Sequence, residues 1–270
     1  MQISVFYDHI LEANEQTGKS IPEILDTIKS YDISALECSI DSIRGKEAEM
    51  SRLFDNAGLN VSEVYGTFQM QEKAALEKAM QFVDSAALMN SNKVLIIPGF
   101  LAPHTLPLGR EIAIHKMADA LIKLTEYAQT KGIAVTMEDF DDKIAPFSTD
   151  DELLWFMEHV PLLRCAFDTG NFLYQDIDVL STFPKLSKYI AHVHCKDRAL
   201  VGLTGEVPKL TVSGKALYTT SVGHGCSPMT EIFKLLHEIN YDDYLVIEHF
   251  GAPDQMSCIK ESADFIKENF

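Results

Sequence analysis

The feature that most constrains the fold is a regular alternation of short apolar segments with longer helical patterns along the 270 residues. The apolar segments are rich in β-branched and aromatic residues, as buried strands are. The stretches between them repeat apolar residues every three to four positions, as helices packed on a sheet do. Eight such units at this chain length predict a (β/α)8 TIM barrel, organised as one domain over residues 1–270.

The expected elements follow the chain without a break in composition that would mark a second domain. The expected strands cover residues 3–6, 33–37, 60–65, 93–97, 135–138, 165–168, 191–194 and 244–248. The expected helices cover residues 20–29, 44–56, 71–89, 108–130, 150–160, 178–188 and 229–239, and a last one begins near 253–254. Residues 199–222 carry no periodicity and are expected to form a long loop over one end of the barrel.

Four of the expected strands end on a carboxylate or an imidazole. These residues are Glu138, Asp168, His194 and Glu248. In a barrel of parallel strands the carboxyl ends of all strands meet on one face, where ligands bind. Three carboxylates and one imidazole suit a divalent metal ion. The sequence therefore predicts one metal centre at this face.

Alternation along the strands supports an inward position for these side chains. Glu138 shares a face with Thr136, and Glu248 shares a face with Val246. On the seventh strand, His192, His194 and Lys196 share one face. Polar groups on an interior face cost several kcal/mol when they lack partners, so their presence there indicates a function.

Charge and composition exclude several classes of partner. Counting 23 Lys and Arg against 40 Asp and Glu gives a formal net charge of −17, which disfavours binding to a nucleic-acid backbone. We find no apolar run of about 18 residues and no export pattern, so we expect a cytoplasmic protein without a membrane partner. The 5 cysteines are scattered, which is typical of reduced thiols.

Five motifs, taken in order, resemble the xylose isomerase-like superfamily of sugar isomerases and epimerases, which are TIM barrels. The similarity covers nearly the whole chain. The motifs are Thr-Met-Glu at 136–138, Phe-Asp-Thr-Gly-Asn at 167–171, His-Val-His-Cys-Lys-Asp at 192–197, Val-Gly-His-Gly at 222–225, and Asn-Tyr-Asp-Asp-Tyr at 240–244 leading to Ile-Glu at 247–248.

The resemblance implies a single divalent metal ion bound by Glu138, Asp168, His194 and Glu248. It also implies that Glu138 and Glu248 act as the acid/base pair on opposite faces of a ketose. Proton removal next to the carbonyl would pass through an enediolate that the metal stabilises. Oxygen-rich ligation with one imidazole favours Mn²⁺ first and Mg²⁺ next, and Co²⁺ or Zn²⁺ also fit.

Four further residues are predicted to bind substrate. Glu37 ends the second strand, and His192 and Lys196 share the face of His194. Asn171 stands where ketose 3-epimerases of this superfamily tend to have a substrate-contacting histidine, so the chain departs from that subgroup. A phosphate site would need a basic or glycine-rich lip, for which 223–225 gives only a slight hint.

The substrate is expected to be a small sugar or keto-polyol, and several activities stay open. A dehydratase of a keto-inositol needs the same four ligands, and so does an isomerase of the hydroxypyruvate type. A barrel that binds a sugar without turning it over is a non-enzyme alternative. Related apurinic-site endonucleases hold three zinc ions with many histidines, whereas this acidic chain lacks histidines at the ends of the third and fourth strands and has Asn171 in place of a further imidazole. The resemblance gives a weak preference for a homodimer.

Overall fold

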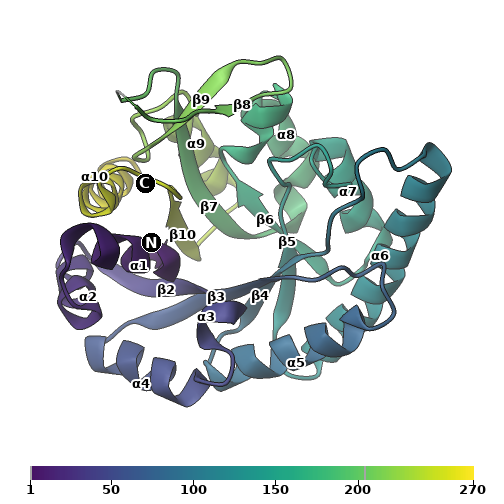
Figure 1. Cartoon of the computed structure of the whole chain (residues 1–270), viewed down its shortest axis with the longest axis horizontal. Helices are drawn as coiled ribbons and strands as arrows, with labels where there is room; N and C mark the ends of the chain where they lie inside the picture. The colour runs from purple at the N-terminus through teal and green to yellow at the C-terminus, as the bar shows by residue number, and fades with distance from the viewer. Residues whose placement is uncertain (1, 204) are drawn as a thin grey trace.

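A closed barrel of eight parallel strands, surrounded by helices, is formed within residues 2–203 and 205–270, which the computed structural model describes (Figure 1). Neighbouring strands follow one another in sequence, and the last pairs with both the first and the seventh, which closes the barrel. The barrel strands are β1 (Gln2–Phe6), β2 (Ile33–Ser39), β3 (Asn60–Thr67), β4 (Lys93–Ile97), β5 (Ala134–Met137), β6 (Leu163–Asp168), β7 (Ile190–Ala199) and β10 (Tyr244–Glu248). The predicted TIM barrel is confirmed.

The helices form the outer ring around the strands (Figure 1). They are α1 (Tyr7–Thr17), α2 (Ile21–Lys29), α3 (Ile40–Ile43), α4 (Glu47–Ala57), α5 (Ala75–Leu88), α6 (Pro107–Gln129), α7 (Asp150–His159), α8 (Val179–Leu186), α9 (Met229–Glu238) and α10 (Gln255–Asn269), with short 3-10 turns η1 (Asn171–Gln175) and η2 (Ser187–Tyr189). Among the helices of the described residues, none is long and apolar enough to cross a membrane.

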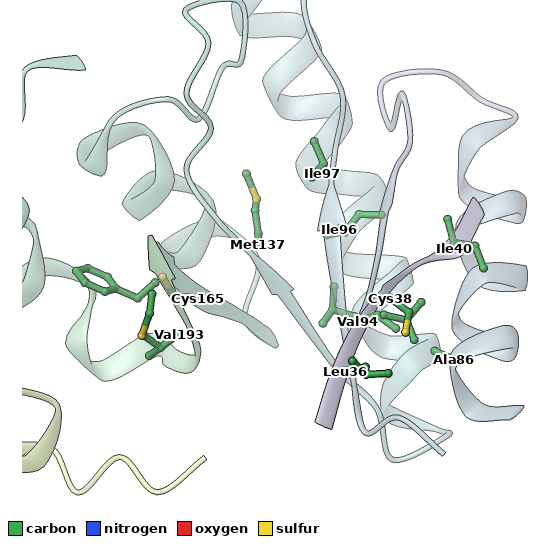
Figure 2. Packing of buried hydrophobic residues seen from close by; sticks show 14 of the residues in the cluster. Leu36, Cys38, Ile40, Ala86, Val94, Ile96, Ile97, Met137, Cys165 and Val193 are labelled. Atoms are coloured by element: carbon green, nitrogen blue, oxygen red, sulfur yellow. The ribbon is translucent and has the colours of Figure 1, made fainter. Parts of the chain in front are cut away.

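The apolar core lies between the strands and the helices. Figure 2 shows part of this layer, with Leu36, Val94, Met137 and Val193 each contributed by a different strand. These outward-facing residues are fully buried under the helices. The alternate positions point into the barrel, where polar side chains meet: the hydroxyl of Thr136 donates to Glu63 at 2.7 Å. The outward faces of the strands are thus apolar and the inward faces carry polar groups, as the alternation along the strands predicted.

Helix α1 lies outside the sequence prediction. It begins at Tyr7, directly after β1 ends at Phe6, so no linker separates the two elements. Of its 11 residues only four are buried, which leaves too weak an apolar pattern to detect from the sequence. The expected helix 44–56 also begins earlier and divides, because Gly45 adopts a positive φ of 75° between α3 and α4.

The segment 199–222 is only partly the irregular loop that the sequence indicated. It contains a hairpin of β8 (Lys209–Leu210) and β9 (Ala216–Thr220), and β9 pairs antiparallel with the end of β7. The expectation of a structureless loop is wrong here because β7 continues well past its predicted end at His194. Figure 1 shows the hairpin standing beyond the barrel, next to the strand end that carries the predicted site.

Strand register aligns Asp168 with His194 and places Glu248 two residues further along, opposite Lys196. A shift between Cys165 and Ala166 places Asp168 opposite His194, and β10 places Val246 opposite His194 on the other side. Such irregularities re-aim side chains near functional sites. The register therefore sets which side chains meet at the barrel mouth.

The outer apolar layer should dominate the stability of the barrel. Leu36→Ala removes a fully buried side chain and should lower the free energy of unfolding by about 2–5 kcal/mol. Leu88→Ala is the matched control, since Leu88 is 66% exposed and should change it by less than about 0.5 kcal/mol. Urea unfolding of both variants measures the difference. Equal losses in the two would contradict this assignment of the core.

Candidate metal centre

The four residues at the predicted strand tips converge on one point. Their ligand atoms all lie within 4.8 Å of one another, and all four side chains are buried. They come from four neighbouring strands of the barrel: Glu138 directly follows β5, Asp168 ends β6, His194 lies in β7 and Glu248 ends β10. This group could bind a metal ion.

His194 stands at the centre of the group and presents its Nδ1 atom to the carboxylates. That nitrogen lies 2.9 Å from an oxygen of Glu138, 3.4 Å from one of Glu248 and 4.0 Å from one of Asp168. The ring of Phe6 packs edge-on against the imidazole, with centroids 5.1 Å apart. An apolar neighbour of this kind excludes water and strengthens the electrostatic interactions within the group.

Asp168 has one oxygen engaged and one available. Its Oδ1 accepts hydrogen bonds from the backbone N–H groups of Gly170 and Asn171, both at 2.7 Å. Its Oδ2 is buried, and among the described residues it finds no hydrogen-bond donor. The nearest ammonium, that of Lys196, lies 3.7 Å from this oxygen. A buried carboxylate oxygen without a hydrogen bond is costly, and a metal ion at the centre of the group would satisfy it. This observation, with the oxygen-rich donor set, fits a divalent metal.

The charges of the group push its carboxyl pKa values apart. Burial raises the pKa of Asp168 to about 8, and the nearby Glu248 and Glu138 charges add to this effect, against the pull of Lys196. Burial also raises the pKa of Glu138. Burial acts in the same direction on Glu248, but the nearby charges of Lys196, His194 and Arg198 together outweigh it and lower that pKa. The pKa of His194 is raised because the charges of Glu37 and Glu138 outweigh burial.

Lys196 and Asn171, both predicted to bind substrate, lie beside the group. The Lys196 ammonium donates to Glu248 Oε1 at 2.6 Å and to Asn171 Oδ1 at 2.7 Å. Asn171 in turn donates to the backbone carbonyl of Asp139. Gly170 makes room for this arrangement, since a Cβ at that position would lie 2.8 Å from the Lys196 side chain. The structure thus brings both residues to the centre, where their role in substrate binding stays a prediction.

Glu37 and His192 lie deeper in the barrel, where Glu37 contacts the Nε2 side of His194 at 3.1 Å. Both are fully buried, and Glu37 Oε2 is 3.0 Å from His192 Nε2. Burial favours the neutral carboxyl, but the charge of His194 and the imidazole contacts lower the pKa of Glu37 to about 2. Burial lowers the pKa of His192 to about 4, so this ring is neutral. Their predicted role as substrate ligands stays a prediction, and their contacts here are to other protein groups.

Sequence analysis missed Glu63, which joins Glu37, His192 and His194 in a second buried group whose ligand atoms also lie within 4.8 Å. Burial and the charge of Glu37 raise the pKa of Glu63 well above its usual range, so its carboxyl is held neutral. Glu37 ends its predicted strand, whereas Glu63 lies within β3 (Asn60–Thr67). The signal that could have found Glu63 is the alternation along that strand, which places it on the face opposite to that of Val64.

The backbone N–H groups of the glycine-rich stretch 223–225 already bind a side chain of the protein, the carboxylate of Asp197. The backbone N–H groups of Gly223 and Gly225 donate to Asp197 Oδ2 at 3.0 and 2.8 Å, and that of Ser227 donates to Asp197 Oδ1 at 2.9 Å. A turn of N–H groups around an anion is a familiar phosphate cradle. Here the Asp197 carboxylate takes the place of the phosphate and anchors the loop after β9.

Comparisons with known proteins agree with the fold. The sequence model of the xylose isomerase-like TIM barrel family matches residues 25–269. An inosose dehydratase of Clostridium beijerinckii is 29% identical over 135 residues, which span 49% of this chain and 45% of that protein. The chain thus matches less than half the length of this relative.

Two solved structures share the fold at low sequence identity. An L-ribulose 3-epimerase superposes with a TM-score of 0.75 at 18% identity, covering 100% of this chain and 94% of that one. A xylose isomerase-like TIM barrel protein of Mycobacterium smegmatis, in complex with magnesium, superposes with a TM-score of 0.71 at 14% identity, covering 99% and 95%. At these identities the likeness shows the fold.

Metal affinity should rise with pH. Below about pH 8 Asp168 carries a proton in the metal-free protein, and an incoming cation must displace it. The pKa of His194 is also raised, so the cation must displace the proton on Nδ1 of that ring as well. Each displaced proton changes the affinity by about tenfold per pH unit. Titration calorimetry of Mn²⁺ binding, in buffers of different ionisation enthalpy, measures both the affinity and the protons released.

The control for this prediction is Asp168→Asn, which removes a ligand together with its proton. We expect it to bind Mn²⁺ more weakly and to release fewer protons than the unchanged protein. An affinity that stays constant between about pH 6 and about pH 8 would contradict the pKa assigned to Asp168.

Proposed function

Because the chain belongs to the xylose isomerase-like TIM barrel family, we propose that it is a divalent-metal-dependent enzyme that moves a proton next to the carbonyl of a small keto-sugar or keto-polyol. The observation that carries the proposal is the convergence of Glu138, Asp168, His194 and Glu248 on one buried point. We propose one metal ion, with Mn²⁺ as the first choice. The three carboxylates and single imidazole support this choice.

The metal would supply Lewis acidity: it would orient the substrate oxygens and stabilise the negative charge that develops when the proton leaves. Asp168 and His194 would act as ligands only. The two glutamates come from the outer two of the four neighbouring strands, β5 and β10, and so flank the other two ligands. That arrangement supports their assignment as the acid/base pair.

The surroundings of the two glutamates suggest which one acts first as the base. Lys196 lowers the pKa of Glu248 and so favours its ionised form, whereas burial raises the pKa of Glu138. Environments that separate two carboxyl pKa values typically assign one group as base and the other as acid. We propose that Glu248 removes the proton and that Glu138 returns one to the substrate, which completes an isomerisation or epimerisation.

A second candidate is a dehydratase of a keto-inositol. Two observations favour it: the similarity to an inosose dehydratase, and the Lys196 ammonium at 2.6 Å from Glu248. Elimination begins with the same proton removal, but a hydroxyl group then leaves with a proton from the enzyme. Lys196 is a cation placed beside the proposed base, where it could serve that leaving group. Both candidates share the first step and differ in the second.

Proton exchange from ²H₂O into a panel of ketoses and a keto-inositol tests the shared first step. With Mn²⁺-loaded protein, deuterium should enter the carbon next to the carbonyl of a substrate. Glu248→Gln should slow this exchange by about 10²–10⁴-fold, because an amide cannot act as a base. Recovery of an isomer or epimer supports the first candidate, whereas release of water and an unsaturated ketone supports the dehydratase.

The matched control is Glu158→Gln, which makes the same chemical change on the exposed surface of α7 and should leave exchange unchanged. If no compound in the panel exchanges while Mn²⁺ binds tightly, the protein is a binding barrel and the proposed chemistry is wrong. An exchange rate that survives in Glu248→Gln would instead move the base to another residue.

A further inference from the structure

A buried polar group lies beneath the proposed metal centre, and the mechanism above does not use it. Besides His194, which it shares with the metal centre, its members are Glu37 on β2, Glu63 on β3 and His192 on β7. All three are fully buried inside the barrel. Burying two carboxyl groups is costly unless other groups satisfy them, so their presence requires a reason.

Glu37 touches both histidines of β7 through a single oxygen. Its Oε2 lies 3.0 Å from His192 Nε2 and 3.1 Å from His194 Nε2. An ionised carboxylate only accepts hydrogen bonds, so both ring nitrogens must donate. The contact therefore places a proton on Nε2 of His194. A neutral imidazole carries one N–H, which leaves the lone pair on Nδ1.

Nδ1 is the atom that faces the other three ligands, at 2.9 Å from Glu138 and 3.4 Å from Glu248. We infer that Glu37 is a positioning residue: it holds the His194 ring with Nε2–H toward the barrel interior and with the Nδ1 lone pair toward the metal. A carboxylate behind a ligand histidine fixes its tautomer and raises its basicity. This inference rests on the metal centre proposed above.

Glu63 provides a matched comparison for Glu37. Its Oε1 accepts from Thr136 at 2.7 Å, and its Oε2 lies 3.4 Å from His192 Nε2. Glu63 is thus as deeply buried as Glu37, but it contacts Thr136 and His192 and makes no hydrogen bond to His194 among the described residues. Glu→Gln at either position keeps the side-chain shape, while only the change at Glu37 replaces the anion that His194 touches.

The test is metal affinity, measured by competition with a chromophoric chelator for Mn²⁺ and Co²⁺. Glu37→Gln should bind either ion about 10–100-fold more weakly than the unchanged protein, and Glu63→Gln should bind nearly as well. Urea unfolding of the metal-free variants separates this loss from a loss of folding. A general structural role would weaken folding and metal binding together in both variants.

A spectroscopic readout on the unchanged protein keeps the inference testable should Glu37→Gln fail to fold. In the Co²⁺-loaded protein, the Nε2–H of a ligand histidine gives a strongly shifted proton signal that disappears in ²H₂O. We expect one such signal in slow exchange, assigned to His194 by its absence in His194→Gln. In folded Glu37→Gln, the proton should exchange faster with solvent.

Three results would overturn the inference. If folded Glu37→Gln binds metal as tightly as the unchanged protein, Glu37 does not position His194, and the proposed metal centre is unaffected. Binding of a second equivalent of metal that Glu63→Gln abolishes would make Glu37 a ligand of another ion, since the lower group also brings its ligand atoms within 4.8 Å. No metal binding by the unchanged protein would overturn the metal centre itself, and the positioning role with it.

Discussion

The imidazole of His194 joins two groups of buried carboxylates, and the interior of the barrel is organised around it. Its Nδ1 faces Glu138 at 2.9 Å, and its Nε2 faces Glu37 at 3.1 Å. Carboxylates on both sides of one ring favour a positive charge there, which a proton supplies in the metal-free protein. A divalent ion at Nδ1 would replace that proton and would compensate the upper carboxylates more completely.

The same arrangement explains why fold and chemistry are separable in this molecule. Outward-facing side chains such as Leu36 and Met137 hold the helices on the barrel, whereas the inward-facing positions are free to carry polar groups. Proton removal next to a carbonyl needs only a metal centre and one carboxylate base. The fate of the substrate after that step depends on the acid that meets it, and here Glu138 and Lys196 are the two candidates.

Sequence reasoning reached the strand tips because parallel strands in a closed barrel end on one face. That rule alone placed Glu138, Asp168, His194 and Glu248 together, and the structure brings their ligand atoms within 4.8 Å. It could not find Glu63, whose contact with Thr136 depends on pairing across three strands. Helix α1 was missed because few of its residues are buried, and the β8–β9 hairpin because its pairing with β7 is non-local.

The most direct test of the central claim is a crystal structure of the Mn²⁺-loaded protein with anomalous data at the manganese absorption edge. One strong anomalous peak is expected, bound by Glu138, Asp168, Glu248 and the Nδ1 atom of His194, with Glu37 still in contact with Nε2. A peak among Glu37, Glu63 and His192 would contradict this account, and so would His194 ligation through Nε2 or a map without any peak at the barrel mouth.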